Sequence, residues 1–199
     1  FQETLARLVA KDPLLASQVD STDHALCERT PEATARVLQN YAHMGTNPNG
    51  VNYPRAYWEG FIARLEGDTK RAHAAFIAAR EEVMTTVEEQ PDFAPALSLL
   101  GLIDAGLGRN EEAIREGRRA CELLPIAKDG VDGPAFAVNL AQIYAWTGNK
   151  DLAIEQIAAL QRVPNYLSYG MLKLHPAWDD LRGDPRFEQL VAAQAPASP

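Results

Sequence analysis

A histidine and a cysteine near the start of the chain, His24 and Cys27, are the first residues whose types could support chemistry. Their spacing of three residues places both on one face of a helix, where they could be two ligands of a metal ion. A zinc site needs three or four ligands, and no second pair at a suitable spacing follows. We therefore expect no metal site. We expect Cys27 and the distant Cys121 to be small buried side chains of helices, although a disulfide between them is compatible with the sequence.

A second candidate group, near the C-terminus, combines His175 with Asp179, Asp180 and Asp184. A histidine beside carboxylates has the residue types of a general acid–base pair. Each carboxylate also has a structural explanation: Asp184 precedes Pro185 as a helix cap, and the other two suit the first turn of a helix through its dipole. We therefore predict that the chain is not an enzyme and binds no cofactor. An acid–base site at His175 and Asp179 is the competing hypothesis.

Composition and charge restrict the class of protein. The chain has 199 residues, of which 46% are hydrophobic and 23% charged, the composition of an ordinary globular protein that can bury a core. The formal net charge of −8 repels nucleic acid and anionic lipid, so we expect neither as a partner. No apolar run approaches the roughly 20 residues that a membrane span needs. We expect a cytoplasmic location, or an exported one if Phe1 is a processed N-terminus.

The stretch from Ala94 to Pro125, APALSLLGLIDAGLGRNEEAIREGRRACELLP, shows which helices the chain forms. It predicts two antiparallel helices, with small residues where the helices cross and Gly108 where the turn needs a positive φ. Gly117, inside the second helix, costs about 1 kcal/mol relative to Ala. Its presence indicates that a neighbouring element approaches closely at that point.

The same pattern occurs once before and once after this stretch. Upstream, YPRAYWEGFIARLEGDTKRAHAAFIAAREEV is followed by a late proline, Pro91, which predicts a lengthened second helix. Downstream, PAFAVNLAQIYAWTGNKDLAIEQIAALQRVP ends on its expected proline. Small residues at the crossing position recur 41 and then 40 residues apart, at Gly60, Gly101 and Ala141. The sequence therefore predicts three stacked helix pairs, over residues 53–91, 94–125 and 134–164.

This pattern resembles the tetratricopeptide repeat (TPR), a helix pair of about 34 residues. The resemblance implies an all-α, right-handed superhelix in which the first helix of each pair lines a concave groove that binds a partner. The groove positions that it implies here are Tyr57, Phe61, Arg64, Ser98, Leu102, Ala105, Val138, Gln142, Ala145 and Trp146.

These groove positions are mostly apolar. They lack the Lys and Asn array with which chaperone-binding relatives hold a C-terminal carboxylate, so the resemblance implies a short apolar or amphipathic partner segment, helical or extended. A second interpretation makes Tyr57, Phe61 and Trp146 core residues between repeats. We expect a protein–protein interaction scaffold or regulatory module. The alternative function is self-association into a homo-oligomer, through the groove or through the long second helix near Val83.

The two ends of the chain predict further helices. Within residues 1–52, a helix that begins with Thr30 as N-cap and Pro31 at its first position follows a short helix, STDHALCE, and the two form a candidate degenerate repeat. QETLARLVA predicts a further helix before them. Residues 165–193 predict capping helices that begin at Pro176 and at Asp184-Pro185. Residues 194–199 predict a disordered tail.

The closing stretch YGMLKLHPAWDDLRGDPRFEQLV is similar to the ending of TPR segments in large bacterial signalling proteins. In those proteins the repeats follow a Ser/Thr kinase, a nucleotide cyclase or a winged-helix DNA-binding domain. The resemblance covers roughly Ala56 to Ala192, and the sequence shows no phosphate-binding Gly-rich loop, kinase-type catalytic run or basic recognition helix. The resemblance therefore implies a partner-binding part, with any effector domain before Phe1.

Overall fold

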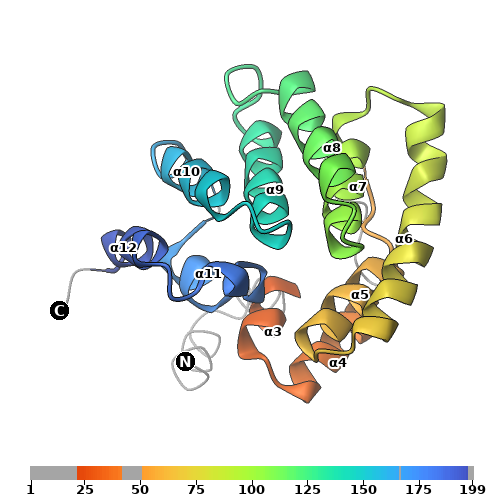
Figure 1. Cartoon of the computed structure of the whole chain (residues 1–199), viewed down its shortest axis with the longest axis horizontal. Helices are drawn as coiled ribbons and strands as arrows, with labels where there is room; N and C mark the ends of the chain where they lie inside the picture. Colours follow the sequence, from red (N-terminus) through yellow and green to blue (C-terminus); the bar gives the residue numbers. More distant parts are fainter. Residues whose placement is uncertain (1–21, 42–50, 166, 197–199) are drawn as a thin grey trace, which may run out of the picture.

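The computed structural model describes residues 22–41, 51–165 and 167–196, and every regular element in these ranges is helical (Figure 1). This confirms the expected all-α class. The expected helix QETLARLVA and residues 197–199 of the expected tail lie outside the described residues. The elements are α3 (Thr22–Glu28), α4 (Pro31–Asn40), α5 (Arg55–Leu65), α6 (Thr69–Glu89), α7 (Ala94–Gly106), α8 (Asn110–Leu123), α9 (Asp132–Trp146), α10 (Lys150–Leu160), α11 (Tyr169–Leu174), the 3₁₀ helix η2 (Pro176–Leu181) and α12 (Pro185–Ala193).

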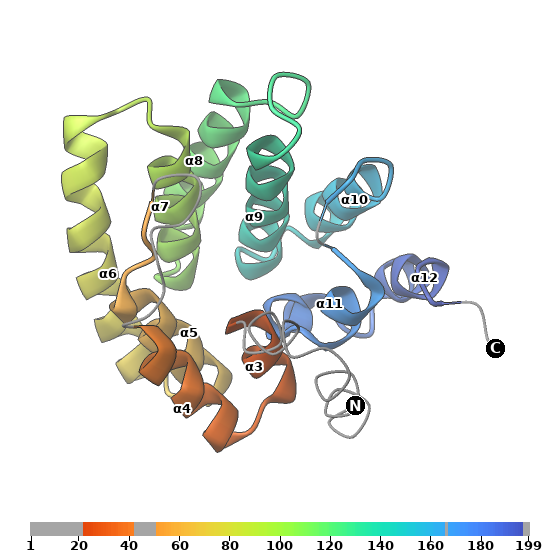
Figure 2. The same cartoon turned by 180° about the vertical axis from the view of Figure 1, so that it is seen from behind.

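The central part consists of three helix pairs, α5 with α6, α7 with α8, and α9 with α10. The first two pairs fall in the ranges over which the sequence predicts them, whereas α9 begins at Asp132, two residues before the predicted range of 134–164. Helix α6 has 21 residues and ends at Glu89, two residues before Pro91. Successive pairs pack on one another through α6 with α7 and through α9 with both α7 and α8. In Figures 1 and 2 the six helices form a curved row with α6 at one end and α10 at the other.

The turn inside each pair depends on a glycine, as the sequence predicts. Gly67, Gly108 and Gly148 have φ values of 74°, 76° and 78°. A Cβ at any of the three would meet no atom within 4 Å. These positions therefore need glycine for its backbone conformation and not for space.

Helix α6 crosses both its pair partner α5 and the next helix, α7, closely around Phe76. A Cβ at Gly60 would lie 2.9 Å from the Phe76 ring, and a Cβ at Gly106 would lie 2.6 Å from the same ring. In α8, a Cβ at Gly117 would lie 2.7 Å from Cδ1 of Ile143. This confirms the close approach that a glycine inside α8 indicates.

The two ends of the described chain meet beside the row of pairs. α3 packs on α11, α4 packs on α5, and η2 packs on α9 (Figure 2). The predicted caps are present: Thr30 Oγ1 accepts a hydrogen bond from Ala33 N at 3.2 Å, and Asp184 Oδ1 accepts one from Arg186 N at 2.9 Å. None of the helices in the described ranges has the length and apolarity to cross a membrane.

Candidate functional site

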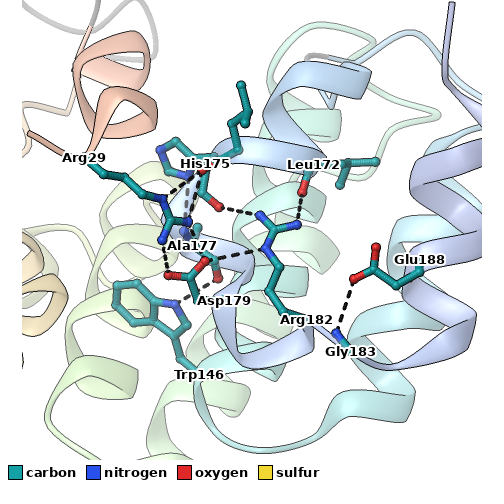
Figure 3. Close-up of polar contacts among 10 residues, drawn as sticks. Arg29, Trp146, Leu172, His175, Ala177, Asp179, Arg182, Gly183 and Glu188 are labelled. Atoms are coloured by element: carbon teal, nitrogen blue, oxygen red, sulfur yellow. Dashed lines mark hydrogen bonds and ion pairs between the residues drawn. The ribbon is translucent and has the colours of Figure 1, made fainter.

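The candidate site lies on the side of the row that is formed by α5, α7 and α9. The chain covers this side with its own residues 175–181, which we call the docked segment. Trp146 Nε1 donates a hydrogen bond to Ala177 O at 3.2 Å (Figure 3). The Phe61 ring centre lies 5.9 Å from that of His175, and Arg64 Nη2 donates to Asp180 Oδ2 at 2.7 Å.

Two cavities adjoin the docked segment. The first, of about 540 Å³, is bordered by α3, α5, α9 and the docked segment, and five aromatic side chains line it: Tyr53, Tyr57, Trp58, Phe61 and Trp178. We call it the aromatic cavity. The second, of about 690 Å³, is bordered by the start of α4, the α5–α6 and α7–α8 turns and the docked segment. We call it the charged cavity, because Arg29, Arg64, Asp179 and Asp180 all line it.

The structure distributes the predicted groove residues between these two cavities. Five of them line the aromatic cavity: Tyr57, Phe61, Leu102, Val138 and Gln142. Three line the charged cavity: Arg64, Ala105 and Trp146. Ser98 is buried and accepts a hydrogen bond from Asn139 Nδ2 at 2.9 Å, and Ala145 is buried as well. Apart from Arg64 and Trp146, all of these side chains are buried within the chain.

Trp58, Asn139 and Trp178 also line the aromatic cavity, although the sequence pattern does not predict them as site residues, and His175, predicted only as an acid–base candidate, lines it too. Trp178 is 2% exposed and belongs to the docked segment. Trp178, two residues after Pro176 in the predicted C-terminal cap, could have indicated that this segment packs on the helix pairs, because so large an apolar side chain is usually buried.

Arg29 and Arg182 hold the docked segment at its two sides (Figure 3). Arg29 Nη1 donates to Asp179 Oδ2 at 2.9 Å, and Arg29 Nη2 donates to Leu174 O at 3.1 Å. Arg182 Nη2 donates to His175 O at 3.3 Å. The backbone of Arg29 has a φ of 56°, a conformation that costs a non-glycine residue about 1–2 kcal/mol. The surrounding contacts therefore hold this residue in a strained conformation.

Arg64 supports the other end of the segment. Its guanidinium carbon lies 4.7 Å from the ring centre of Trp146, a cation–π arrangement, while its Nη2 binds Asp180. The Trp146 ring therefore contacts a cation on its face and donates its N–H to the docked segment. These contacts can recognise an acidic segment and a backbone carbonyl.

The acid–base hypothesis depends on His175 and Asp179. Burial lowers the pKa of His175 below 6.5, so its ring is neutral at pH 7. Its Nδ1 accepts a hydrogen bond from Ala177 N at 3.3 Å, so Nε2 carries the proton, 3.7 Å from Asp23 Oδ1. Both Asp179 oxygens accept hydrogen bonds from Arg29. The structure thus gives these two residues different partners and does not join them as an acid–base pair.

The remaining candidates have structural surroundings. Asp184 is held by Arg186, whose hydrogen bonds lower the pKa of that carboxyl to about 2. Cys27 and Cys121 are half-buried free thiols, and burial raises the pKa of each to about 11. No three His, Cys, Asp or Glu side chains within the described ranges are grouped so that they could hold a metal ion.

Comparison of the chain with models of known protein families, with curated proteins and with solved structures finds no match to any of them.

Proposed function

We propose that the chain is a protein–protein interaction module of TPR type, and that the side formed by α5, α7 and α9 binds a short segment of a partner protein. The observation that supports this most is the docked segment. It combines a proline, a tryptophan and two aspartates, and it is bound through Trp146, Arg29 and Arg64. A partner segment with an aromatic residue followed by carboxylates would find the same contacts.

Exchange of the docked segment for a partner segment is energetically reasonable. In the Arg29–Asp179 and Arg64–Asp180 pairs, between 36% and 44% of each side chain is exposed. Ion pairs at this exposure typically contribute 0.2–1 kcal/mol. The partner then has to replace the burial of Trp178, which requires a large aromatic side chain of its own. This gives the proposal a definite ligand chemistry.

Selection from a random peptide library displayed on phage, with the full chain immobilised, tests the proposal. We expect enriched peptides in which an aromatic residue stands next to acidic residues. Their affinity should fall about tenfold or more for the double variant Arg29→Gln/Arg64→Gln. The matched control, Arg115→Gln/Arg162→Gln, changes two exposed arginines that line neither cavity and should bind like the parent chain.

Two outcomes contradict the proposal. One is a selection that enriches no sequence, and the other is enriched peptides that bind both double variants equally. Circular dichroism of both variants shows that loss of binding is not loss of fold. We do not propose self-association, because Val83, the residue on α6 that suggested it, is 5% exposed and packs in the core of its own chain.

A further inference from the structure

The histidine at the start of the docked segment is a buried titratable group whose hydrogen bond depends on its protonation state (Figure 3). His175 is 7% exposed, and its ring centre lies 5.9 Å from that of Phe61. It is the N-cap of η2, because its Nδ1 accepts a hydrogen bond from Ala177 N at 3.3 Å. A protonated imidazole has two N–H donors and no acceptor. The cap of the docked segment therefore exists only while His175 is neutral.

The second ring nitrogen of His175 has an incomplete partner. Its Nε2 is buried and lies 3.7 Å from Oδ1 of Asp23 on α3. This distance is too long for a hydrogen bond. In addition, 57% of the Asp23 side chain is exposed, so solvent screens its charge. Asp23 therefore compensates only part of the cost of a positive charge on the buried ring.

The other charged groups around His175 are mainly arginines. Arg29, between α3 and α4, donates to the carbonyl of the preceding residue, and Arg182 donates to His175 O. Asp179 of η2 is already paired with Arg29. Helix α3 also places His24 on the aromatic cavity. The residues of α5 and α9 that line this cavity are uncharged: Tyr57, Trp58, Phe61, Ala135, Val138, Asn139 and Gln142. A proton on His175 would thus add a third positive charge beside two arginines.

These surroundings give docking a pH dependence of definite sign. Burial, as the largest influence, and the two arginines lower the pKa of His175, while Asp23 and Asp179 oppose them in part. In a released segment the ring reaches water, where its pKa is about 6.5. Since the pKa is lower in the docked state, docking is at full strength above about pH 6.5 and weakens as the pH falls below that value, by at most about tenfold for each pH unit.

We propose that protonation of His175 loosens the docked segment, so that the side formed by α5, α7 and α9 takes up a partner segment more readily at mildly acidic pH. In the protonated ring, Nδ1–H points at the N–H of Ala177, and the segment loses its N-cap. The charged ring also gains solvation when it leaves the apolar contact with Phe61. The uptake of a partner rests on the proposed function, whereas the loosening itself requires no partner.

Hydrogen exchange of the full chain, measured by NMR without any partner, tests the loosening. The reporters are the amide of Ala177 and the indole N–H of Trp146, which donates to Ala177 O and does not contact the ring nitrogens of His175. Their protection factors, which correct for the ordinary pH dependence of exchange, are compared at pH 7.5 and pH 5.5. We expect both to fall at least about threefold at pH 5.5. The reference is the amide of Ala153 in α10, which donates to Asn149 O and should not lose protection.

Three variants identify the titrating group. His175→Asn keeps an acceptor for Ala177 N and cannot be protonated, so the protection of both reporters should not depend on pH. Asp23→Asn removes the carboxylate that favours a charged ring in the docked state, so the fall in protection at pH 5.5 should become larger. A histidine with a merely structural role would not respond in this way. The matched control, His73→Asn, changes an exposed histidine of α6 and should behave like the parent chain.

The proposal is overturned if the Trp146 indole keeps its protection at pH 5.5, if His175→Asn loses protection as the parent does, or if Asp23→Asn makes the fall smaller. If His175→Asn does not fold, the Asp23→Asn comparison decides. A peptide selected at neutral pH should bind the parent at least about threefold more tightly at pH 5.5, and equal affinity would overturn the uptake of a partner. A selection that enriches no peptide contradicts the proposed function alone, because the exchange measurement uses no peptide.

Discussion

Arg29 and Asp179 are 150 residues apart in the chain and form a bidentate ion pair. Arg29 Nη1 lies 2.9 Å from Oδ2 of Asp179, and Nη2 lies 2.5 Å from Oδ1. This pair joins the connection between α3 and α4 to the docked segment. Paired geometry of this kind is more directional than a single Lys–carboxylate contact. It therefore fixes where the segment lies relative to the N-terminal helices.

A double-mutant cycle with Arg29→Gln and Asp179→Asn measures the strength of this pair. We expect a coupling energy of about 0.5–1.5 kcal/mol in urea unfolding, since the geometry is favourable but both side chains are partly exposed. The comparison pair is Arg55 and Glu59, an exposed pair within α5. Its coupling should be about 0.3–0.5 kcal/mol. Equal coupling in the two cycles would show that the long-range pair contributes no more than a surface contact.

A second prediction concerns pH and a buried acidic pair. Glu116 of α8 lies beside the buried Asp104 of α7, which accepts a hydrogen bond from Arg80 Nε at 2.8 Å. Burial, and then the charge of Asp104, raise the pKa of Glu116 from 4.5 to about 8. Since the pKa is higher in the folded state, the stabilising contribution is complete below about pH 4.5 and is lost as the pH rises through about 8.

The parent chain should therefore lose roughly 2 kcal/mol of unfolding free energy between pH 5 and pH 8.5 through this residue, about half of what the full pKa shift implies, because solvent screens a partly exposed pair. Glu116→Gln keeps a hydrogen-bond donor toward Asp104 and cannot ionise, so its stability should vary less with pH over that interval. Glu122→Gln, an exposed change on the same helix, should leave the pH profile unchanged. Urea unfolding at several pH values checks this, and parallel profiles for the parent and Glu116→Gln would contradict it.

The crossing around Phe76 gives a third prediction. Gly60→Ala adds a methyl group 2.9 Å from a fully buried ring that also lies against Gly106, so the ring has no free side toward which to move. The overpacking should outweigh the gain in helix propensity and cost about 1–2 kcal/mol of unfolding free energy. The control is Gly170→Ala in α11, where the nearest atom is 3.9 Å away. Thermal unfolding should leave that variant unchanged or slightly more stable, and an equally tolerated Gly60→Ala would refute the tight crossing.

The fourth prediction separates core residues from binding residues at the site. Leu102 lines the aromatic cavity but is 1% exposed, so Leu102→Ala should cost about 2–5 kcal/mol. Leu152→Ala on α10, where the side chain is 36% exposed, should cost less than about 1 kcal/mol. Chemical unfolding of the two variants gives the comparison. A small loss at Leu102 would mean that this part of the site is looser than its burial indicates.

The helix pairs could be predicted from the sequence because their determinants are local. A turn that needs a positive φ requires glycine at Gly67, Gly108 and Gly148, and a close crossing requires a small residue at Gly60. The late proline after α6 marks the end of a longer helix in the same way. Each of these constraints acts over a few residues, so it leaves a visible pattern in the sequence.

The position of the docked segment over the site could not be predicted from such local patterns. The docked segment is a six-residue 3₁₀ helix with its preceding histidine, too short for a hydrophobic period to place it. Its position depends on Asp179 meeting Arg29 and on Asp180 meeting Arg64, pairings across more than one hundred residues that no spacing encodes. The sequence therefore indicated which residues face one side of the helix row, but not that the chain covers them itself.

The meeting of α3 with α11 has a consequence for how the molecule opens. In a stack of helix pairs with free ends, the terminal pair can fray alone, and protection against hydrogen exchange decreases toward both ends. Here α3, the first described helix, packs on α11 near the other end of the chain, so neither of the two can detach without breaking contacts of the other. Helices α3 and α11 should therefore open together, as one cooperative unit. This unit can form only after the chain between the two helices has folded and brought them into contact.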